Sequence, residues 1–353
     1  TLPEMLLGLL SHLQSVAAVI FTFGLVIVIH EFGHFIMCRI IGIRVERFAF
    51  GFGPELFGFE SGGTRFSVCL LPLGGFVKPA GESMDETTGK PDEYFAKPWH
   101  KRLMVVWAGP VMNYVLAWAL FAGLVYFKGL PQPSMTTEIG DVFIDFPAYK
   151  AGIRPDDVIL QIDGKPLANW KELAETINKN PGNELTVRFT RGAETRTVKV
   201  IPRVDAANNR GLIGIAPTTI LTHLGALGAM REGAELCWHY TASTVKELSS
   251  KIVRREKPDM AGPIGIIQMV SRAARSGIED LLSFIAVISV MIGFFNFLPV
   301  PLLDGGHAAM YLWEGLTRKP LTEQAMVYAN SVGIAFLLTV LIFATYQDVM
   351  RLR

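Results

Sequence analysis

The sequence predicts a multi-span α-helical membrane protein with a small membrane-associated β-sheet and one extracytoplasmic α+β domain. Three observations lead to this fold class. Half of the 353 residues are hydrophobic and only 18% are charged, below the roughly 25% typical of soluble domains. Four apolar stretches are about long enough to cross a bilayer. The segment between the second and third stretches alternates strand-like runs with a helix-like run.

Four transmembrane helices are predicted, because crossing a hydrocarbon core about 30 Å thick takes about 20 residues. The apolar stretches are residues 16–40, 103–127, 281–303 and 326–346. Lys and Arg gather after the first, before the second and between the last two, whereas residues 1–38 contain none. Since such residues accumulate on the cytoplasmic side, the N-terminus, residues 129–280 and the C-terminus are expected outside. Arg351 and Arg353 run against this rule.

The charge balance and the cysteines exclude two further classes of protein. The chain has 33 Lys and Arg against 32 Asp and Glu, a formal net charge of +1. Nucleic-acid binding needs a cationic excess, so we expect no nucleic acid among the partners. The four apolar stretches make the lipid bilayer an expected partner. Cys38, Cys69 and Cys237 show no C-x-x-C spacing. We expect buried apolar side chains there rather than disulfides or a thiolate metal cluster.

The chain is predicted to have four parts, which are a membrane part (1–128), the α+β domain (129–217), an amphipathic linker (218–280) and a second membrane part (281–353). In the first part, glycines interrupt residues 48–53 and residues 65–71 have strand composition. Apolar strands beside a membrane need backbone partners, so we expect a small sheet buried against the helices or dipping into a cavity. Residues 81–96 are predicted to form a solvated loop.

In the α+β domain, the sequence predicts strands and one helix. The strands are residues 142–144, 158–162, 185–189 and 195–201, and the helix is residues 170–178. Residues 230–253 then place apolar side chains at helical intervals. An amphipathic helix on the membrane surface fits this pattern, although packing against the domain would produce it too.

The first predicted span contains an H-E-x-x-H sequence, His30-Glu31-Phe32-Gly33-His34. Residues i and i+4 share one helical face, so His30 and His34 can bind one Zn²⁺ with Glu31 beside the open position. A carboxylate there can take a proton from water. The match also occurs by chance on surface helices, but three ionisable side chains inside a bilayer are costly and mark function. We interpret Glu31 as the catalytic base.

A catalytic zinc usually takes three protein ligands, and Asp304 is the candidate for the third. Pro299 and Pro301 break the predicted third helix just before it. Broken helices at membrane depth line cavities, where a ligand and a substrate chain need space. The alternative is an aspartate at a helix end in the membrane interface, and His307 is a weaker ligand candidate.

These motifs together resemble the site-2 proteases, a family of intramembrane zinc metalloproteases, and most closely the bacterial regulator-of-sigma-E type. The matching residues are His30, Glu31 and His34, residues 51–53 and 72–78, Ala108-Gly109-Pro110 with Asn113, Gly262-Pro263-Ile264, and residues 296–305. The resemblance implies Zn²⁺ held by His30, His34 and Asp304, and Glu31 as general base. It further implies substrate contacts at Asn296 and Pro299 and a bacterial cytoplasmic (inner) membrane.

The α+β domain resembles a PDZ domain through residues 148–159 and 162–164. PDZ domains capture extended chain ends by adding a strand to a sheet edge, although a cap without a ligand is the alternative. The best-known sigma-E proteases carry two tandem PDZ domains, whereas one fits between residues 130 and 215. The mode of substrate gating therefore departs from the family pattern.

Two further motifs leave alternatives open. Gly74, Gly75 and Phe76 are predicted to form an exposed edge that pairs with an unwound substrate helix, whose scissile carbonyls are otherwise hydrogen-bonded. A glycine turn without substrate contact is the alternative. Asn113 either hydrogen-bonds across helices or lets helices pack closely.

The sequence thus predicts an intramembrane zinc metalloendopeptidase that cleaves transmembrane segments of single-span proteins in regulated intramembrane proteolysis. By resemblance, the substrate is a membrane-bound anti-sigma factor after a first cut, with signal-peptide remnants as a second class. One alternative is a non-catalytic PDZ adaptor with a structural metal, against which the intact Glu31 argues. A zinc transporter is a second alternative, but the sequence shows none of the internal repeats that are typical of transporters.

Overall fold

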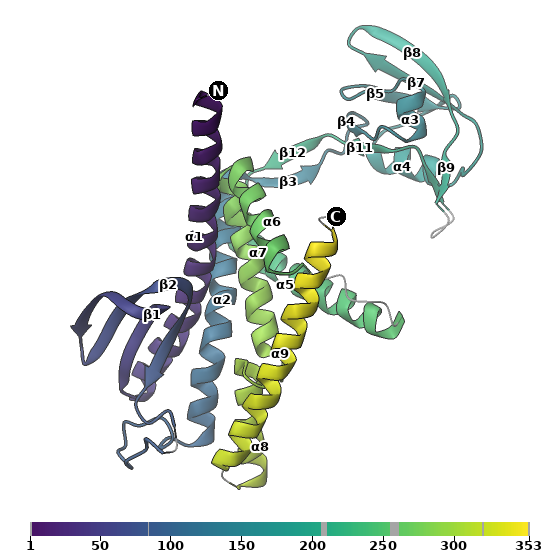
Figure 1. Cartoon of the computed structure of the whole chain (residues 1–353). Coiled ribbons are helices and arrows are strands. Elements are labelled where there is room, and N and C mark those ends of the chain that lie inside the picture. Colours follow the sequence, from purple (N-terminus) through teal and green to yellow (C-terminus); the bar gives the residue numbers. More distant parts are fainter. Residues whose placement is uncertain (1, 84, 206–209, 255–260, 320, 352–353) are drawn as a thin grey trace. The chain divides into compact units, whose positions relative to one another are not determined.

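The computed structural model (Figure 1) describes residues 2–83, 85–205, 210–254, 261–319 and 321–351. The chain divides into two compact units. Thr1–Val125 and Gly225–Arg353 form one, which we call the membrane unit, and Tyr126–Leu224 form the other, which we call the β-rich unit. The described residues contain four helices able to cross a membrane, a small sheet and one α+β unit, which confirms the predicted architecture. The extracytoplasmic position of the α+β unit stays a prediction.

The four membrane helices are α1 (Leu2–Ile41), α2 (Trp99–Lys128), α7 (Ile278–Phe297) and α9 (Glu323–Arg351). The apolar stretch 281–303 is not helical to its end, because α7 stops at Phe297, and the predicted break of this helix at Pro299 and Pro301 is confirmed. Leu298 is already extended, with φ −69° and ψ 142°. A residue before proline avoids the helical region, and Pro299 has no N–H to continue the helix.

Helix α6 (Pro263–Ser276) lies beside α1, α7 and α9 and was not predicted as a separate helix. Its start is held by Asp348 of α9, whose buried carboxylate accepts the backbone N–H groups of Gly262 and Gly265 at 2.9 Å each. A Cβ at Gly262 would lie 2.6 Å from the same carboxylate. The Gly262-Pro263 motif is thereby explained as a helix start that admits a capping side chain from another helix.

Helix α5 (Ala226–Arg254) includes the predicted amphipathic helix and packs against α2 and α7. Gly233 lies against the backbone of α2, since a Cβ there would be 2.9 Å from the Ala122 nitrogen. The Tyr240 and Phe121 rings stack with centroids 5.6 Å apart. Part of the apolar surface of α5 is therefore covered by membrane helices, an arrangement that neither interpretation of the pattern had named, while Trp238, Ile252 and Val253 stay exposed.

Strands β1 (Val45–Ser61) and β2 (Thr64–Pro79) form the small sheet, joined at a Gly62-Gly63 turn with positive φ at both residues. Each strand pairs in more than one register. Residues 75–79 pair with residues 45–50 on one side, and residues 64–69 pair with residues 55–61. Among the described residues, no strand pairs with the other side of residues 75–79. This segment is thus an edge of the sheet.

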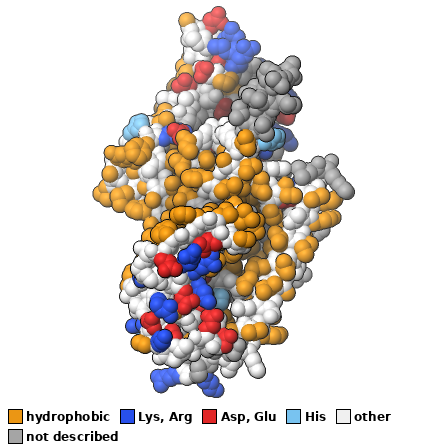
Figure 2. Space-filling view, turned by 60° about the vertical axis from the view of Figure 1, so that its left-hand side comes forward, with side chains coloured by type: hydrophobic (Ala, Val, Ile, Leu, Met, Phe, Trp, Pro, Cys, Tyr) orange, Lys and Arg blue, Asp and Glu red, His pale blue; other side chains and the backbone are white. Residues whose placement is uncertain are grey.

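The sheet packs on α1 closely at Gly75, while its outward surface carries both apolar and charged side chains. A Cβ at Gly75 would lie 3.3 Å from Ile27 and 3.4 Å from Glu31, so the edge strand lies directly on α1. Several large apolar side chains remain exposed, among them Leu56, Phe57 and Phe59. In Figure 2, hydrophobic side chains cover most of the middle of the molecule, and Lys, Arg, Asp and Glu side chains gather below them.

The loop after β2 is less solvated than predicted. Glu93 is 3% and Tyr94 is 6% exposed, so the prediction of a solvated loop over residues 81–96 is wrong at these positions. The Glu93 carboxylate accepts three backbone N–H groups, from Thr88, Gly89 and Lys90. Tyr94 packs with α1 and α2 in a core that also holds Tyr311. Hydrogen bonding to its own loop lets the chain bury an acidic side chain here.

The β-rich unit is a small α+β fold around one apolar core. Its elements are β3 (Leu130–Pro133), β4 (Ile139–Val142), α3 (Pro147–Lys150), β5 (Val158–Ile162), β6 (Lys165–Pro166), α4 (Trp170–Asn178), β7 (Leu185–Arg191), β8 (Glu194–Val200), β9 (Arg203–Asp205), β10 (Arg210–Leu212), β11 (Ile215–Pro217) and β12 (Thr219–Thr222). The largest sheet has the order β6-β5-β7-β8, and α4 buries Leu173 and Ile177 in the core with Phe189.

Most elements predicted for this unit are confirmed, and one strand is displaced. The predicted helix over residues 170–178 matches α4, and β5, β7 and β8 lie where strands were predicted. The strand predicted over residues 142–144 is wrong, because β4 ends at Val142 and pairs with β11 through Ile139, Asp141 and Val142. Phe143 and Ile144 are exposed instead, so an apolar run here marks surface rather than a buried strand.

Candidate metal centre

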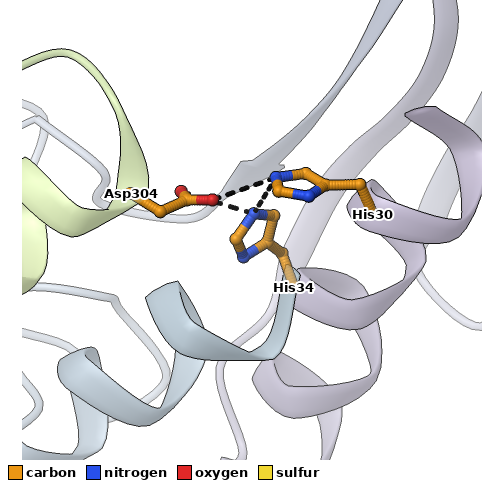
Figure 3. Close-up of side chains that lie close together, drawn as sticks. All are labelled: His30, His34 and Asp304. Carbon is orange, nitrogen blue, oxygen red and sulfur yellow. Dashed lines mark hydrogen bonds and ion pairs between the residues drawn. The ribbon is translucent and has the colours of Figure 1, made fainter. Parts of the chain in front are cut away.

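The structure brings together three side chains from two distant parts of the sequence (Figure 3). His30 and His34 project from one face of α1, one turn apart. Asp304 begins α8 (Asp304–Thr317), the helix that follows the proline-rich break. His30 Nε2 lies 3.0 Å and His34 Nε2 lies 3.6 Å from the Asp304 carboxylate, and the two Nε2 atoms are 3.2 Å apart. The three candidate ligand atoms lie within 4.8 Å of one another.

Helix α2 orients both imidazoles from behind. His34 Nδ1 lies 2.8 Å from the Val105 carbonyl oxygen, and His30 Nδ1 lies 3.1 Å from the Asn113 side-chain nitrogen. Val105, Gly109 and Asn113 follow one another at intervals of four residues, which places them on one face of α2. Contacts of this kind at the second ring nitrogen leave the Nε2 atoms directed at the shared space.

Gly109 of α2 lies next to the Nε2 atoms of both histidines, where a side chain would not fit. A Cβ at this position would lie 2.8 Å from His30 Nε2 and closer still to His34 Nε2. Glycine therefore keeps an opening between the two imidazoles that any side chain would fill. Gly33 of α1 makes the helix contact possible, because a Cβ there would overlap the Ala108 carbonyl oxygen. Two imidazole nitrogens and a carboxylate around such an opening match the donor set that zinc prefers.

Glu31 lines the same cavity as the three candidate ligands. The cavity has a volume of about 620 Å³ and is walled by α1, the edge strand, the loop after β2, α8 and α9. Glu31 hydrogen-bonds the backbone of Val77 in the edge strand, and its Cγ lies close to Gly75. A carboxylate held beside three ligand atoms in a cavity that can admit water is positioned for proton transfer.

Asp304 reaches the site through a segment that packs very tightly. Cβ atoms at Gly305 and Gly306 would overlap the carbonyl oxygens of Leu298 and Val300, so the broken segment lies directly on the start of α8. Leu302 has φ 80°, a conformation that non-glycine residues rarely adopt, and its side chain lines the cavity. Backbone strain of this kind is retained where the surrounding structure imposes it, often at functional sites.

Helix α8 is anchored to α2 by a buried ion pair. Arg102 is 4% exposed and its guanidinium lies 2.5 Å from the Glu314 carboxylate. The same guanidinium stacks over the Tyr311 ring at 4.7 Å and the Phe95 ring at 5.1 Å. These contacts hold the helix that carries Asp304 against the helix that supports the histidines. Nothing in the sequence pattern had pointed to Arg102, because a single basic residue at a helix start is common.

The predicted substrate-binding residues divide into three groups. Asn296 and Phe76 line the cavity, and Asn296 Nδ2 also donates to the Ile292 carbonyl oxygen at 3.0 Å. Gly75 and Gly74 lie on the edge segment, where Gly74 packs against the Phe52 ring. Pro299 is exposed and is absent from the residues that line the cavity. A substrate contact at Pro299 thus has the least support from the geometry.

Sequence reasoning had not found several other residues at this site. Glu82 and Asn330 line the cavity, as does His307, which the sequence had offered only as a weaker ligand candidate. Glu82 as a whole is exposed, but where it lines the cavity partial loss of hydration raises the pKa of its carboxyl to about 7, and the nearby Lys78 opposes this shift. The alternative for Asn113 is decided, because it hydrogen-bonds across helices to His30. Its spacing of four from Gly109 and eight from Val105 was the signal that could have placed it at the site.

A histidine pair on a membrane helix, a carboxylate from a second membrane region and an adjacent glutamate define a membrane-embedded metalloprotease. The chain belongs to peptidase family M50, whose family model matches residues 18–340. It is 36% identical over 371 residues to a Rhizobium meliloti protein named "Putative zinc metalloprotease", with 97% of this chain and 98% of that protein covered.

The comparisons also found two further relatives and a solved domain. The chain is 27% identical to the Bacillus subtilis protein named regulator of sigma-W protease RasP, covering 96% of this chain and 99% of that protein. A Clostridium acetobutylicum protein, also named as a zinc metalloprotease, is 31% identical over 95% of this chain and 97% of its own length. A Listeria monocytogenes PDZ domain matches 24% of this chain and 88% of its own, with 20% identity and a TM-score of 0.21.

Proposed function

We propose that this membrane metalloprotease cleaves the transmembrane segments of single-span membrane proteins, with His30, His34 and Asp304 holding Zn²⁺ and Glu31 as general base. The observation that carries the proposal is the convergence of three ligand atoms within 4.8 Å beside Glu31 in one cavity. His30, Glu31 and His34 of α1 meet Asp304 at the start of α8 there, although the two segments lie far apart in the sequence.

The chemistry assigned to the chain's own residues is proton transfer and positioning. Bound zinc supplies a Lewis acid that polarises the scissile carbonyl and makes water acidic. Glu31 accepts the proton that water loses when it attacks the carbonyl carbon. The same carboxyl then gives this proton to the leaving amine nitrogen as the C–N bond breaks. The backbone of Val77 holds the Glu31 carboxylate in place between these two steps.

The edge segment is proposed to present the substrate. A helical substrate hides its carbonyls in its own hydrogen bonds, so one stretch must unwind before cleavage. Residues 75–79 offer unpaired strand edge beside Glu31, and pairing there would replace the lost backbone bonds. Phe76 and Asn296, which line the cavity, would then contact side chains of the unwound stretch. We extend this role to Gly74, Gly75 and, with less geometric support, Pro299.

The biological setting is proposed from the sequence pattern and the relatives. Because one relative is named a regulator of sigma-W protease, an anti-sigma factor already cut once is a fitting substrate class here, and signal-peptide remnants are a second. Membrane-flanking Lys and Arg favour a cytoplasmic membrane location with the β-rich unit outside. We propose residues 129–217 as a PDZ-like domain that reads or filters chain ends, and residues 218–280 as the linker to the second membrane part.

The test is cleavage of a tagged single-span protein by the purified full chain in detergent, with zinc content measured alongside. Glu31→Gln is expected to lower the cleavage rate by roughly 10²–10⁴-fold while about one zinc per chain is retained. Glu235→Gln, an exposed carboxylate on α5, serves as the control and should leave the rate unchanged.

Two outcomes would overturn the assignment. Equal cleavage by the Glu31→Gln variant would remove Glu31 from the reaction. Bound zinc without cleavage of any single-span substrate would favour the non-catalytic adaptor, in which the metal is structural and the β-rich unit binds partners.

A further inference from the structure

Asn113 lies at the centre of the contacts behind the histidine pair. Its side chain is fully buried on α2, and its amide nitrogen is 3.1 Å from His30 Nδ1. Its backbone carbonyl oxygen accepts the hydroxyl of Ser289, a buried residue of α7, at 2.8 Å. Three membrane helices therefore meet at this residue, and its backbone is held independently of its side chain.

The Asn113 side chain leaves one polar atom without a partner. Its Oδ1 is buried and makes no hydrogen bond. A buried amide oxygen without a donor costs free energy, so such an atom calls for an explanation. The oxygen and nitrogen of an amide occupy nearly the same positions after a 180° turn about χ2, and the assignment follows from the hydrogen-bond network.

The tautomer of His30 supplies a donor for Oδ1 once the amide is turned, and the amide NH₂ group then takes the position that has no partner. A neutral imidazole that offers its Nε2 lone pair to a metal carries its proton on Nδ1. That proton needs an acceptor, and the turned amide presents Oδ1 to it. His34 is treated in the same way, because its Nδ1 lies 2.8 Å from the Val105 carbonyl oxygen, which can only accept. Both ring protons would then be fixed by α2, at Val105 and at Asn113.

We propose that Asn113 is a positioning residue for the metal centre. In the metal-loaded protein its Oδ1 accepts the His30 Nδ1 proton, which fixes the tautomer and the ring plane that direct Nε2 at the metal. The inference rests on the proposed metal site and adds to it the group that prepares His30. Hydrogen bonds of this kind from a ligand's second nitrogen typically change metal affinity 10–100-fold when lost.

A purely structural role for Asn113 predicts the opposite order of variants. If the side chain only fills space, Asn113→Leu should keep the site, because leucine has nearly the same size and no unsatisfied polar atom. Asn113→Asp should then be the worse variant, since it buries a charge. If Asn113 is the acceptor for His30, Asp retains that role and Leu removes it. The ranking of the two variants separates the explanations.

The experiment measures zinc affinity of the full-length protein in detergent by competition with a chromogenic chelator. Relative to wild type, Asn113→Leu and Asn113→Ala are expected to raise the zinc Kd about 10–100-fold. Asn113→Asp should stay closer to wild type than either. Ser289→Ala is the control, because it removes the contact to the Asn113 backbone and leaves the side chain in place. Its zinc Kd should not change.

Thermal unfolding of the zinc-free proteins shows whether each variant folds, and Asn113→Ala replaces Asn113→Leu if the leucine does not fit. Wild-type affinity in the variants without an acceptor, or weaker binding by Asn113→Asp than by Asn113→Leu, would overturn the positioning role. Absence of zinc binding in wild type would instead overturn the proposed metal site itself. The two failures are therefore distinguishable.

Discussion

The two halves of the metal centre are built in opposite ways. His30 and His34 come from one uninterrupted helix and are four residues apart, and α2 contacts the second nitrogen of each ring. Asp304 comes after a broken segment with a strained residue, Leu302, and depends on tight packing of glycines against carbonyl oxygens. The histidine half is a regular helix whose imidazoles are contacted by α2, and the aspartate half is irregular backbone that is fixed by close packing.

This difference shows where the precision of each half originates. Helix geometry alone places two imidazoles on one face, so the histidine half needs only the correct rotamer and tautomer from its neighbours. The aspartate half has no regular structure to set its position. It relies on the Arg102–Glu314 pair and on the close contact between residues 298–301 and the start of α8. The two halves should therefore fail differently when they are disturbed.

Filling the opening in the histidine half is expected to have the largest effect. Gly109→Ala would place a methyl group 2.8 Å from His30 Nε2 and closer to His34 Nε2. Because that methyl group occupies the space for a metal, we expect zinc binding to fall below detection and cleavage to fall at least about 100-fold. Zinc content and cleavage rate of the purified variant check this.

Gly123→Ala on the same helix is the matched control for that prediction. No atom lies within 4 Å of a Cβ at Gly123, so this variant should keep both zinc and activity. Alanine favours helix over glycine, so both variants should leave α2 formed. Normal zinc content in Gly109→Ala would mean that the metal does not lie between the two imidazoles.

Breaking the anchor of the aspartate half should act on stability more than on the site. Arg102→Met leaves the Glu314 carboxylate, which is 16% exposed, without its partner. Removal of one member of a buried pair costs about 3–5 kcal/mol of folding free energy. We expect a clearly lower midpoint of thermal unfolding and a smaller loss of zinc affinity than Gly109→Ala produces.

An exposed ion pair on α5 provides the comparison for the Arg102 variant. Arg231 is 82% exposed and pairs with Glu235 one turn away. Such pairs contribute about 0.3–0.5 kcal/mol, so Arg231→Met should hardly change the midpoint. Replacing both Arg102 and Glu314 with methionine should recover part of the lost stability, since no charge is left uncompensated. Equal losses in the Arg102 and Arg231 variants would show that the buried pair is no anchor.

The same contrast decided what the sequence could predict. His30, Glu31 and His34 were identified from their spacing within a predicted membrane span, because a helix converts an interval of four residues into a shared face and ionisable side chains in a bilayer mark function. The four membrane helices followed from length and apolar composition, which the bilayer demands directly. Asp304 was reached through the prolines that break its helix and through family resemblance. Regular structure makes sequence spacing informative, and the histidine half was therefore easier to predict from the sequence than the aspartate half.

What the sequence did not predict depends on contacts between distant residues. The apolar stretch 281–303 runs six residues beyond the end of α7 at Phe297, and although the prolines predicted the break, composition does not show the path of the chain after it. The roles of Arg102 and Asp348 need partners 212 and 86 residues away, which no local pattern reports. The multiple pairing of β1 with β2 likewise has no signature in an alternating pattern.

The smallest expected effect concerns Glu82, which lies on the loop after β2 and belongs to neither half. Limited hydration in the cavity raises the pKa of Glu82 from 4.5 to about 7, with added repulsion from Glu86 and Glu31 and opposition from Lys78 and His34. The folded protein thus keeps this proton between pH 4.5 and about 7, whereas the unfolded chain loses it. Stability contributed by Glu82 should therefore fall as pH rises through this window and stay constant above it.

Thermal unfolding of wild type and Glu82→Gln between pH 4.5 and 8 isolates this contribution from the other titrating groups. Because glutamine cannot ionise, the variant should unfold at nearly the wild-type temperature at pH 4.5 and at a higher temperature at pH 8. Glu86→Gln removes a neighbouring repulsion and should shift the window to lower pH. A difference between wild type and Glu82→Gln that does not change with pH would place Glu82 in water. The loop after β2 would then take no part in the electrostatics of the site.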